Sequence, residues 1–210
     1  MGKVTALKTD GVGRRIKVFV DGSLLFIVDK KVIAKAGLQL GQDLSVSQIE
    51  ELKRTFLLQN CLDAALHYLS YRPRSESEIR QRLNQRGFGN NLINIVIDTL
   101  KERGLVDDVA FARFWKDNRL LFSPRSRRLV QHELRQKGVS AEMADEVTSG
   151  SDDESSAYKA GVRKMRGLTS ADYDEFCRRL FGYLRRRGFS YEVAGRVIER
   201  LWLARPTNSK

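Results

Sequence analysis

The feature that most constrains the fold of this chain is an internal repeat of about fifty residues. Three segments align without gaps and end at Gly87, Gly138 and Gly188, which are 51 and 50 residues apart. A leucine lies four residues before each glycine, an apolar residue follows it directly, and a valine lies nine residues beyond it. Self-similarity at such a period is typical of arrays whose units pack mainly on their neighbours.

The repeated glycine predicts the end of a helix. Lys and Arg in the preceding turn suit the negative end of the helix dipole, and glycine adopts the left-handed conformation that closes a helix. The next apolar residue packs back on that helix, and Ser140 or Ser190 can cap the following one. A further helix is expected upstream in each unit, at about 61–71, 108–122 and 154–166. Each repeat should therefore hold three helices.

A Pro-Arg-Ser element occurs at the same offset in the first two repeats, at 73–75 and 124–126. Proline disfavours helix at the residue before it, so each element marks a boundary. The first element begins a capping box that ends at Glu78, whereas Leu129 in the second repeat forms none. The third repeat has 174–176, Asp-Glu-Phe, at this offset.

The first 45 residues carry strand signals instead of helical ones. Three segments rich in apolar residues, at about 4–8, 16–20 and 24–28, predict a small meander. Asp21-Gly22 lies between the second and third segments and predicts a tight hairpin. Residues 32–36 are expected to form a single helical turn. Such a small sheet should dock on the helices that follow it.

The sequence thus predicts a mainly α fold, with a tandem of three three-helix repeats in an elongated curved array and a small N-terminal β-meander or hairpin subdomain. A capping box from Ser47 to Glu50 is expected to begin the helical part. The expected division is 1–46 for the β-rich subdomain, 47–60 for a linking helix, 61–108, 109–150 and 151–204 for repeats one to three, and 205–210 for a tail.

The chain is basic, with 38 Lys and Arg against 26 Asp and Glu and a net charge of +12. The charge is uneven: +4 over 1–60, zero over 61–108, +3 over 109–150 and +5 over 151–210. A positive balance favours a polyanionic partner. No apolar run approaches the ~20 residues that span a bilayer, and no signal peptide is evident, so a cytoplasmic protein is expected.

The sequence offers no catalytic or metal site. The chain has two cysteines and two histidines, His67 and His132, which argues against a disulfide framework or a multi-ligand zinc site. Asp107-Asp108 and 152–154 are interpreted as helix caps, because no third carboxylate lies near enough in sequence to complete a cation site. We therefore expect no cofactor, no metal ion and no catalytic residue.

Arginines cluster where the second helix of the first two repeats begins, at Arg72, Arg74, Arg125, Arg127 and Arg128. Guanidinium groups bind phosphate or carboxylate oxygens bidentately, although such residues can also be solvated charges. A helix start disfavours cations, which argues for a binding role. A second cluster lies on the late helix of repeat three, where part of it merely complements the helix C-terminus. It consists of Arg178, Arg179, Arg185, Arg186 and Arg187.

Over residues 60–200 the chain resembles the RecX family, which modulates the RecA recombinase. No single motif is diagnostic, but their order and spacing are fairly specific, and the strand-rich head resembles an extension that only part of the family carries. The motifs are 65–69 (ALHYL), 72–78 (RPRSESE), 86–88 (RGF), 103–108 (RGLVDD), Phe111-Ala112 with Arg119, and 134–138 (LRQKG).

The resemblance implies a non-enzymatic regulator that binds the RecA–DNA filament in its helical groove. Such a regulator inhibits the ATPase and strand exchange of RecA and limits filament growth or stability, within homologous recombination, DNA repair and the SOS response. The implied partners are the RecA filament and single- or double-stranded DNA, bound directly or through RecA, with no membrane contact and a monomeric protein. The alternative is a stand-alone nucleic-acid-binding module of basic three-helix repeats.

With the resemblance, the candidate filament- or DNA-binding residues gain three members, Arg119, Arg135 and Lys137. The full set is Arg72, Arg74, Arg119, Arg125, Arg127, Arg128, Arg135, Lys137, Arg178, Arg179, Arg185, Arg186 and Arg187.

Overall fold

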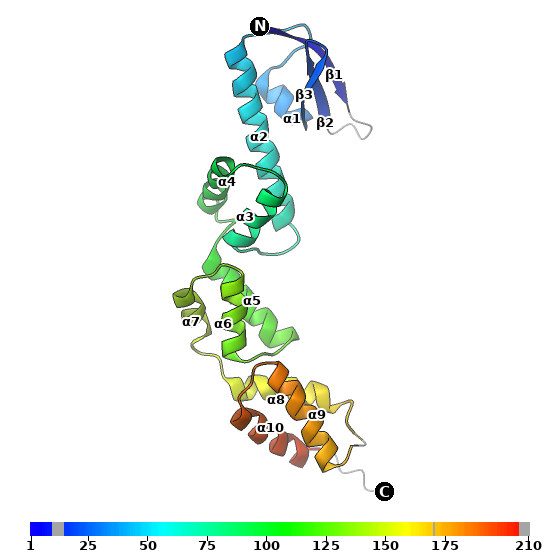
Figure 1. The fold of residues 1–210 in the computed structure, drawn as a ribbon, viewed down its shortest axis with the longest axis vertical. Helices are drawn as coiled ribbons and strands as arrows, with labels where there is room; N and C mark the ends of the chain where they lie inside the picture. Colours follow the sequence, from blue (N-terminus) through cyan, green and yellow to red (C-terminus); the bar gives the residue numbers. More distant parts are fainter. Residues whose placement is uncertain (10–14, 170, 206–210) are drawn as a thin grey trace. The chain divides into compact units, whose positions relative to one another are not determined.

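The computed structural model describes residues 1–9, 15–169 and 171–205 (Figure 1). The chain falls into two compact units. The first unit consists of Met1–Arg72 and Ile79–Arg103, and the second of Pro73–Glu78 and Gly104–Lys210. Most of the predicted tail, 206–210, lies outside the described residues. No helix in the described ranges combines the length and the apolarity needed to cross a membrane.

An antiparallel sheet of four strands forms the N-terminal part of the first unit, with the order β3-β2-β1-β4. The predicted hairpin is confirmed, since Asp21 has φ of +49° and Gly22 has φ of +80°, which a tight two-residue turn requires. The short strand β4 was not predicted, because two residues leave no periodicity to read. The strands are β1 (Gly2–Thr9), β2 (Arg15–Val20), β3 (Ser23–Asp29) and β4 (Asp43–Leu44).

One face of the sheet is covered by α1 (Lys30–Ala36) and by the first half of the long helix α2 (Val46–Leu69). Phe56 of α2 is buried and meets Phe26 of β3 edge to face, with ring centroids 4.7 Å apart. Because α2 runs without a break from Val46 to Leu69, the expected linking helix and the first helix of repeat one are a single helix. This anchors the small sheet on the helical part of the unit.

The capping box that begins α2 is formed by Ser45 and Gln48, so the prediction that placed it at Ser47 is wrong. The Ser45 hydroxyl accepts the Gln48 amide at 3.1 Å, and Oε1 of Gln48 accepts the Ser45 amide at 2.8 Å. Strand β4 holds the backbone extended up to Leu44, so the helix can begin directly after it. Ser47 then lies inside the first turn, with its hydroxyl 2.9 Å from that of Ser45.

The first unit is completed by α3 (Glu76–Gln85), from Ile79 onward, and by α4 (Asn90–Glu102). Helix α4 packs against α2. The buried side chains of both helices follow helical spacing. They are Ile79 and Leu83 on α3, and Ile93, Val96, Ile97 and Leu100 on α4.

The second unit contains two groups of three helices, each around a separate core. Phe111 and Leu134 are central to the first core, and Phe176, Leu184 and Phe189 to the second. The helices are α5 (Asp108–Phe122), α6 (Arg127–Gln136), α7 (Ala141–Thr148), α8 (Asp153–Met165), α9 (Tyr173–Arg186) and α10 (Tyr191–Leu203). The predicted three-helix repeats are thus confirmed, while their curved array and the residue limits of the predicted domains stay predictions.

The repeated glycine closes a helix in all three repeats, as predicted. Gly87, Gly138 and Gly188 have φ of +84°, +83° and +86°. In each repeat the residue after the glycine donates its amide to the carbonyl of the repeated leucine, with N···O distances of 3.1–3.3 Å. All three leucines are fully buried. Ser140 and Ser190 cap α7 and α10 as expected.

The third repeat differs at the start of its second helix. Helix α9 begins 15 residues before its glycine, whereas α3 and α6 begin 11 residues before theirs. This extra turn replaces the Pro-Arg-Ser element and is capped by Asp172, whose side chain accepts the Glu175 amide at 2.8 Å. Phe176 is fully buried within it, 5.3 Å from the ring of Trp202.

Candidate functional site

Two pairs of hydrogen bonds at corresponding positions of the repeats, here called the serine–aspartate clasps, lie inside the second unit. In the first clasp the Ser75 hydroxyl donates to the Lys137 carbonyl at 2.6 Å, and the Glu76 amide donates to Asp108 at 2.8 Å. In the second the Ser126 amide donates to the Arg187 carbonyl at 3.0 Å, and the Arg127 amide donates to Asp153 at 2.6 Å. Each Pro-Arg-Ser element therefore contacts the glycine cap and the first helix of the following repeat.

The clasps bring two of the repeated glycines into close contact with a neighbouring segment. A Cβ atom on Gly138 would lie 2.2 Å from Cβ of Ser77, and one on Gly188 would lie 2.5 Å from the hydroxyl of Ser126. At Gly87 such an atom would meet nothing within 4 Å. Glycine is thus required for its backbone conformation in all three repeats and for its small size in two.

The two aspartates at the start of α5, and likewise those at the start of α8, accept hydrogen bonds from two different helices. Asp107 and Asp152 cap their own helices, as predicted, by accepting amides of the first turn at 2.8–3.3 Å. The second aspartate of each pair, Asp108 or Asp153, accepts the first amide of the preceding α3 or α6. That second role was not predicted, because the partner lies 26 or more residues away.

We expect Asp153→Ala to destabilise the second unit by about 1–2 kcal/mol, because it leaves an amide of α6 without its acceptor. Asp108→Ala is expected to have a similar effect through α3. Urea unfolding followed by tryptophan fluorescence measures this, since Trp115 and Trp202 both lie in the second unit. The exposed Asp145→Ala is the control. Equal midpoints for Asp145→Ala and Asp153→Ala would show that the clasp contributes nothing.

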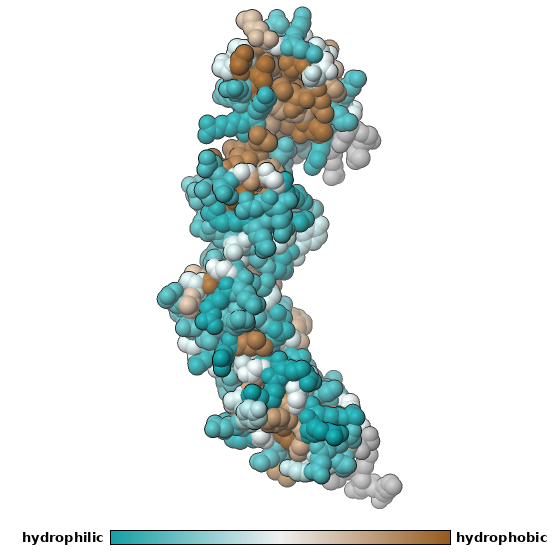
Figure 2. Space-filling view, in the orientation of Figure 1, coloured by the Kyte–Doolittle hydropathy of each residue, from teal (hydrophilic) through white to brown (hydrophobic). Residues whose placement is uncertain are grey.

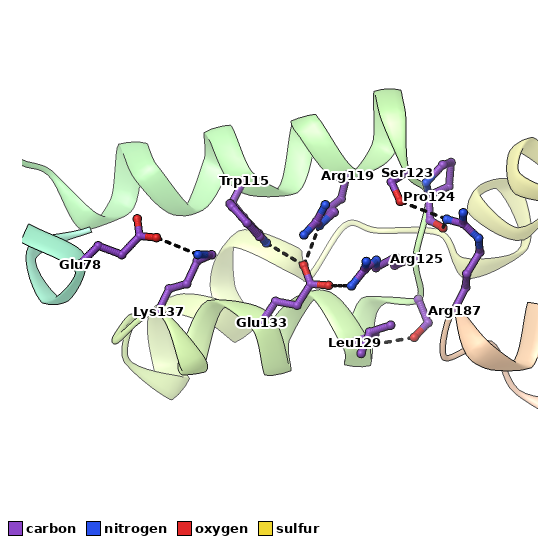
Figure 3. A network of polar contacts seen from close by, with 11 residues as sticks. Glu78, Trp115, Arg119, Ser123, Pro124, Arg125, Leu129, Glu133, Lys137 and Arg187 are labelled. Atoms are coloured by element: carbon purple, nitrogen blue, oxygen red, sulfur yellow. Dashed lines mark hydrogen bonds and ion pairs between the residues drawn. The ribbon is translucent and has the colours of Figure 1, made fainter. Parts of the chain in front are cut away.

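A buried carboxylate, Glu133 on α6, gathers three donors around it (Figure 3). Its Oε2 accepts Nε1 of Trp115 at 2.8 Å and Nε of Arg119 at 2.7 Å, while its Oε1 accepts Nη1 of Arg125. The Arg119 guanidinium also lies 4.4 Å from the centroid of the Trp115 ring. Glu133 is only 8% exposed, and its contacts join α5, α6 and the loop between them.

Two further cations extend the network at its ends (Figure 3). Lys137 Nζ pairs with Glu78 at 2.8 Å and lies 4.2 Å from the centroid of the Trp115 ring. Arg187 Nη1 donates to the Ser123 hydroxyl at 3.1 Å and to the Pro124 carbonyl at 3.0 Å. These contacts reinforce the regions of the first and second clasp respectively.

Burial lowers the pKa of two guanidinium groups of this network, and the crowding of positive charge adds to the shift of one of them. Burial lowers the pKa of Arg119 below its ordinary value. Burial also lowers the pKa of Arg125, and repulsion from Arg119 and Arg187 lowers it further. Both residues stay charged near neutral pH, so they depend on Glu133 for compensation.

The candidate arginines therefore separate into two groups. Arg119, Arg125, Lys137 and Arg187 are engaged in the internal network described above. Arg72 and Arg74 are half-buried and also take part in interactions within the chain. The side chains that remain exposed in the second unit are Arg127, Arg128, Arg135, Arg178, Arg179, Arg185 and Arg186.

Three of the exposed arginines come together in one pocket of about 580 Å³ between α6 and the turn that joins α9 to α10. They are Arg128, Arg135 and Arg185. The pocket is completed by Ser126, Leu129, His132, Asp153, Gly188, Ser190 and Tyr191. Figure 2 shows a largely hydrophilic surface over the helices of this unit, whereas a broad hydrophobic area lies over the N-terminal sheet and α1.

Among the described residues, no group of three His, Cys, Asp or Glu side chains is placed to hold a metal ion. Burial raises the pKa of the Cys61 thiol to about 11, so this group is protonated at neutral pH and is a poor nucleophile. His67 and His132 pair with Tyr71 and Gln136, respectively, at 3.1 and 3.0 Å.

Three family models match the chain in succession. The first, second and third three-helix domains of RecX match residues 61–110, 107–147 and 152–198. Regulatory protein RecX of Clostridium perfringens is 28% identical over 207 residues, which is 96% of this chain and 97% of that protein. Regulatory protein RecX of Lactobacillus gasseri is 29% identical over 202 residues, which is 94% of this chain and 74% of that protein.

Solved structures agree with the fold. A crystal structure of regulatory protein RecX has a TM-score of 0.62 at 21% identity and covers 95% of this chain and all of its own. RecX from Lactobacillus salivarius has a TM-score of 0.58 at 20% identity and covers 70% of this chain and 97% of its own. Because three successive RecX domain models match the chain and its relatives align with nearly its full length, the chain belongs to the RecX family.

Proposed function

We propose that this protein binds the filament that RecA forms on DNA and inhibits its ATPase, its strand exchange and its growth. The observation that carries the proposal is the succession of three RecX domains, each with the helices and glycine caps of the repeat. The exposed arginines of the second unit support it, because a filament of protein and DNA offers both carboxylates and phosphates to guanidinium groups.

The protein is proposed to act without chemistry of its own. The charged groups that the structure buries, those of the Glu133 network and of the two clasps, hold helices together, which supports this proposal. Inhibition would then arise because a bound regulator restrains a filament that must change shape during ATP turnover. Such an effect needs only a difference in affinity between the two filament shapes.

The test is the DNA-dependent ATPase of RecA, measured with increasing amounts of the purified protein. We expect ATP turnover to fall, while the protein alone hydrolyses nothing. Co-sedimentation with RecA filaments on single-stranded DNA, compared with DNA alone, reports binding separately. Unchanged turnover at several-fold excess would contradict the proposal. Strong sedimentation with DNA that RecA does not enhance would favour the alternative of a plain nucleic-acid-binding module.

A further inference from the structure

The pocket between α6 and the α9–α10 turn has the charge of an anion site. Of the described residues that line it, three are arginines and one, Asp153, is a carboxylate. The Oδ1 atom of Asp153 is already used by the Arg127 amide at 2.6 Å. Arg128, His132 and Arg135 are spaced so that they share one face of α6.

One of these arginines is held in place before any ligand arrives. Nη1 of Arg185 donates to the Phe189 carbonyl at 2.7 Å, and its guanidinium carbon lies 3.9 Å from the centroid of the Tyr191 ring. A guanidinium that is already oriented loses less conformational freedom when it binds an oxyanion. Its other nitrogen atoms remain on a residue that is exposed overall.

The starts of two helices line the same pocket, and that of α10 adds to its positive field. Ser126 caps α6 and Ser190 caps α10, and both residues belong to the lining. The positive end of a helix dipole stabilises an anion close to it. The start of α6 is already compensated by the Asp153 carboxylate, so the start of α10 is the one that acts in the same direction as the arginines.

The walls of the pocket suit more than a lone inorganic ion. Its volume of about 580 Å³ leaves room for a group larger than a phosphate ion. Leu129 and Tyr191, which is 66% exposed, supply apolar surface beside the arginines. A phosphate with its attached sugar and base matches this mixture of cationic and apolar wall.

We propose that this pocket binds the phosphodiester backbone of single-stranded DNA, with Arg128, Arg135 and Arg185 as the phosphate contacts. The choice of DNA rests on the proposed function, which places the protein on a recombinase–DNA filament. The pocket would give the regulator a contact with the nucleic acid itself, beside its contacts with the recombinase.

The test is fluorescence anisotropy of a labelled oligothymidylate of about 20 nucleotides, titrated with the protein alone from ~50 to ~300 mM NaCl. The variant Arg128→Gln/Arg135→Gln is expected to raise Kd about tenfold or more at low salt. It should also reduce the slope of log K against log salt by about 1.4, because each phosphate contact to a single strand contributes about 0.7. Both side chains are exposed, so the thermal midpoint should stay unchanged.

The control is Arg113→Gln/Arg166→Gln, which removes two exposed arginines of the same unit outside the pocket. It should leave the salt slope unchanged. Equal loss of slope in both variants would overturn the proposal, because the effect would then come from overall charge. Arg185→Lys keeps the charge but alters the stack on Tyr191, so its affinity should fall between wild type and the pocket variant.

The RecA ATPase separates this inference from the proposed function. A pocket variant that binds DNA normally but no longer inhibits RecA would assign the pocket to the recombinase, and the inference would be wrong. A wild-type protein that fails to inhibit RecA, yet shows the expected slopes with DNA, would contradict the proposed function and leave the DNA site supported.

Discussion

Replacing Gly188 or Gly138 with alanine is expected to destabilise the second unit by about 2–5 kcal/mol. Any L-residue at these left-handed positions costs about 1–2 kcal/mol. The added methyl group would also overlap Ser77 beside Gly138, or Ser126 beside Gly188, at 2.2–2.6 Å, and overpacking of this kind costs about 1–3 kcal/mol. Urea unfolding followed by tryptophan fluorescence reports this loss.

Gly87→Ala separates the two contributions, because its backbone conformation is the same and the space around it is open. Its cost should be limited to the conformational part, about 1–2 kcal/mol, measured by far-UV circular dichroism. Gly195→Ala, inside α10 and in open space, should be neutral or stabilising by up to about 1 kcal/mol. If all three repeated glycines lost the same stability, the close contacts at the clasps would have no energetic weight.

The second large effect is expected at Glu133. Glu133→Gln should destabilise the second unit by about 2–4 kcal/mol, because it leaves the partly buried Arg119 and Arg125 close together without a counter-charge. The exposed Glu146→Gln on α7 removes the same charge and should change the free energy of unfolding by less than about 0.5 kcal/mol. Urea midpoints measured by tryptophan fluorescence give both values, and Trp115 reports directly because it donates to Glu133.

A double variant sharpens that test. Glu133→Gln combined with Arg125→Gln removes one of the two uncompensated cations, so it should be more stable than the sum of the single changes predicts. Additive losses would mean that Arg125 does not depend on Glu133. In that case solvent, and not the carboxylate, would compensate the guanidinium groups.

Local features of this fold could be predicted from the sequence because their causes are local. Gly138, the basic residues before it and Val139 after it lie within one turn of each other, and together they specify a helix end. The Asp21-Gly22 hairpin depends only on the backbone freedom of two residues. For the same reason the expected bounds of the first helix agree with the structure to within a few residues in the second and third repeats, whereas in the first repeat that helix begins already at Val46.

The clasps and the Glu133 network could not be predicted, because their partners are brought together only by helix packing. Ser75 meets Lys137 across 62 positions, and nothing near Ser75 encodes that distance. A signal did exist: Asp107-Asp108 and Asp152-Asp153 each begin a repeat that follows a Pro-Arg-Ser element. That co-occurrence could have indicated that the first aspartate of each pair caps its own helix, while the second binds the Pro-Arg-Ser segment of the preceding repeat.

The candidate site was predicted by residue type but not by grouping. Arg125 and Arg128 are three positions apart, yet Arg125 turns toward the buried Glu133 while Arg128 lines the exposed pocket. Sequence proximity therefore placed structural and surface cations in one cluster. Only the spacing of Arg128, His132 and Arg135 along one face of α6 could have indicated the division.

Because of the extra turn of α9, the third repeat lacks the Pro-Arg-Ser element that would contact a further repeat after it. The residues that would reach a further repeat are replaced there by a helical turn whose Phe176 is committed to the repeat's own core. A fourth repeat appended after Leu203 would find no serine to clasp its glycine. A duplicate of the second repeat inserted before α8 would carry both halves of the clasp, so the contacts seen here would accommodate an added repeat inside the series but not after its last member.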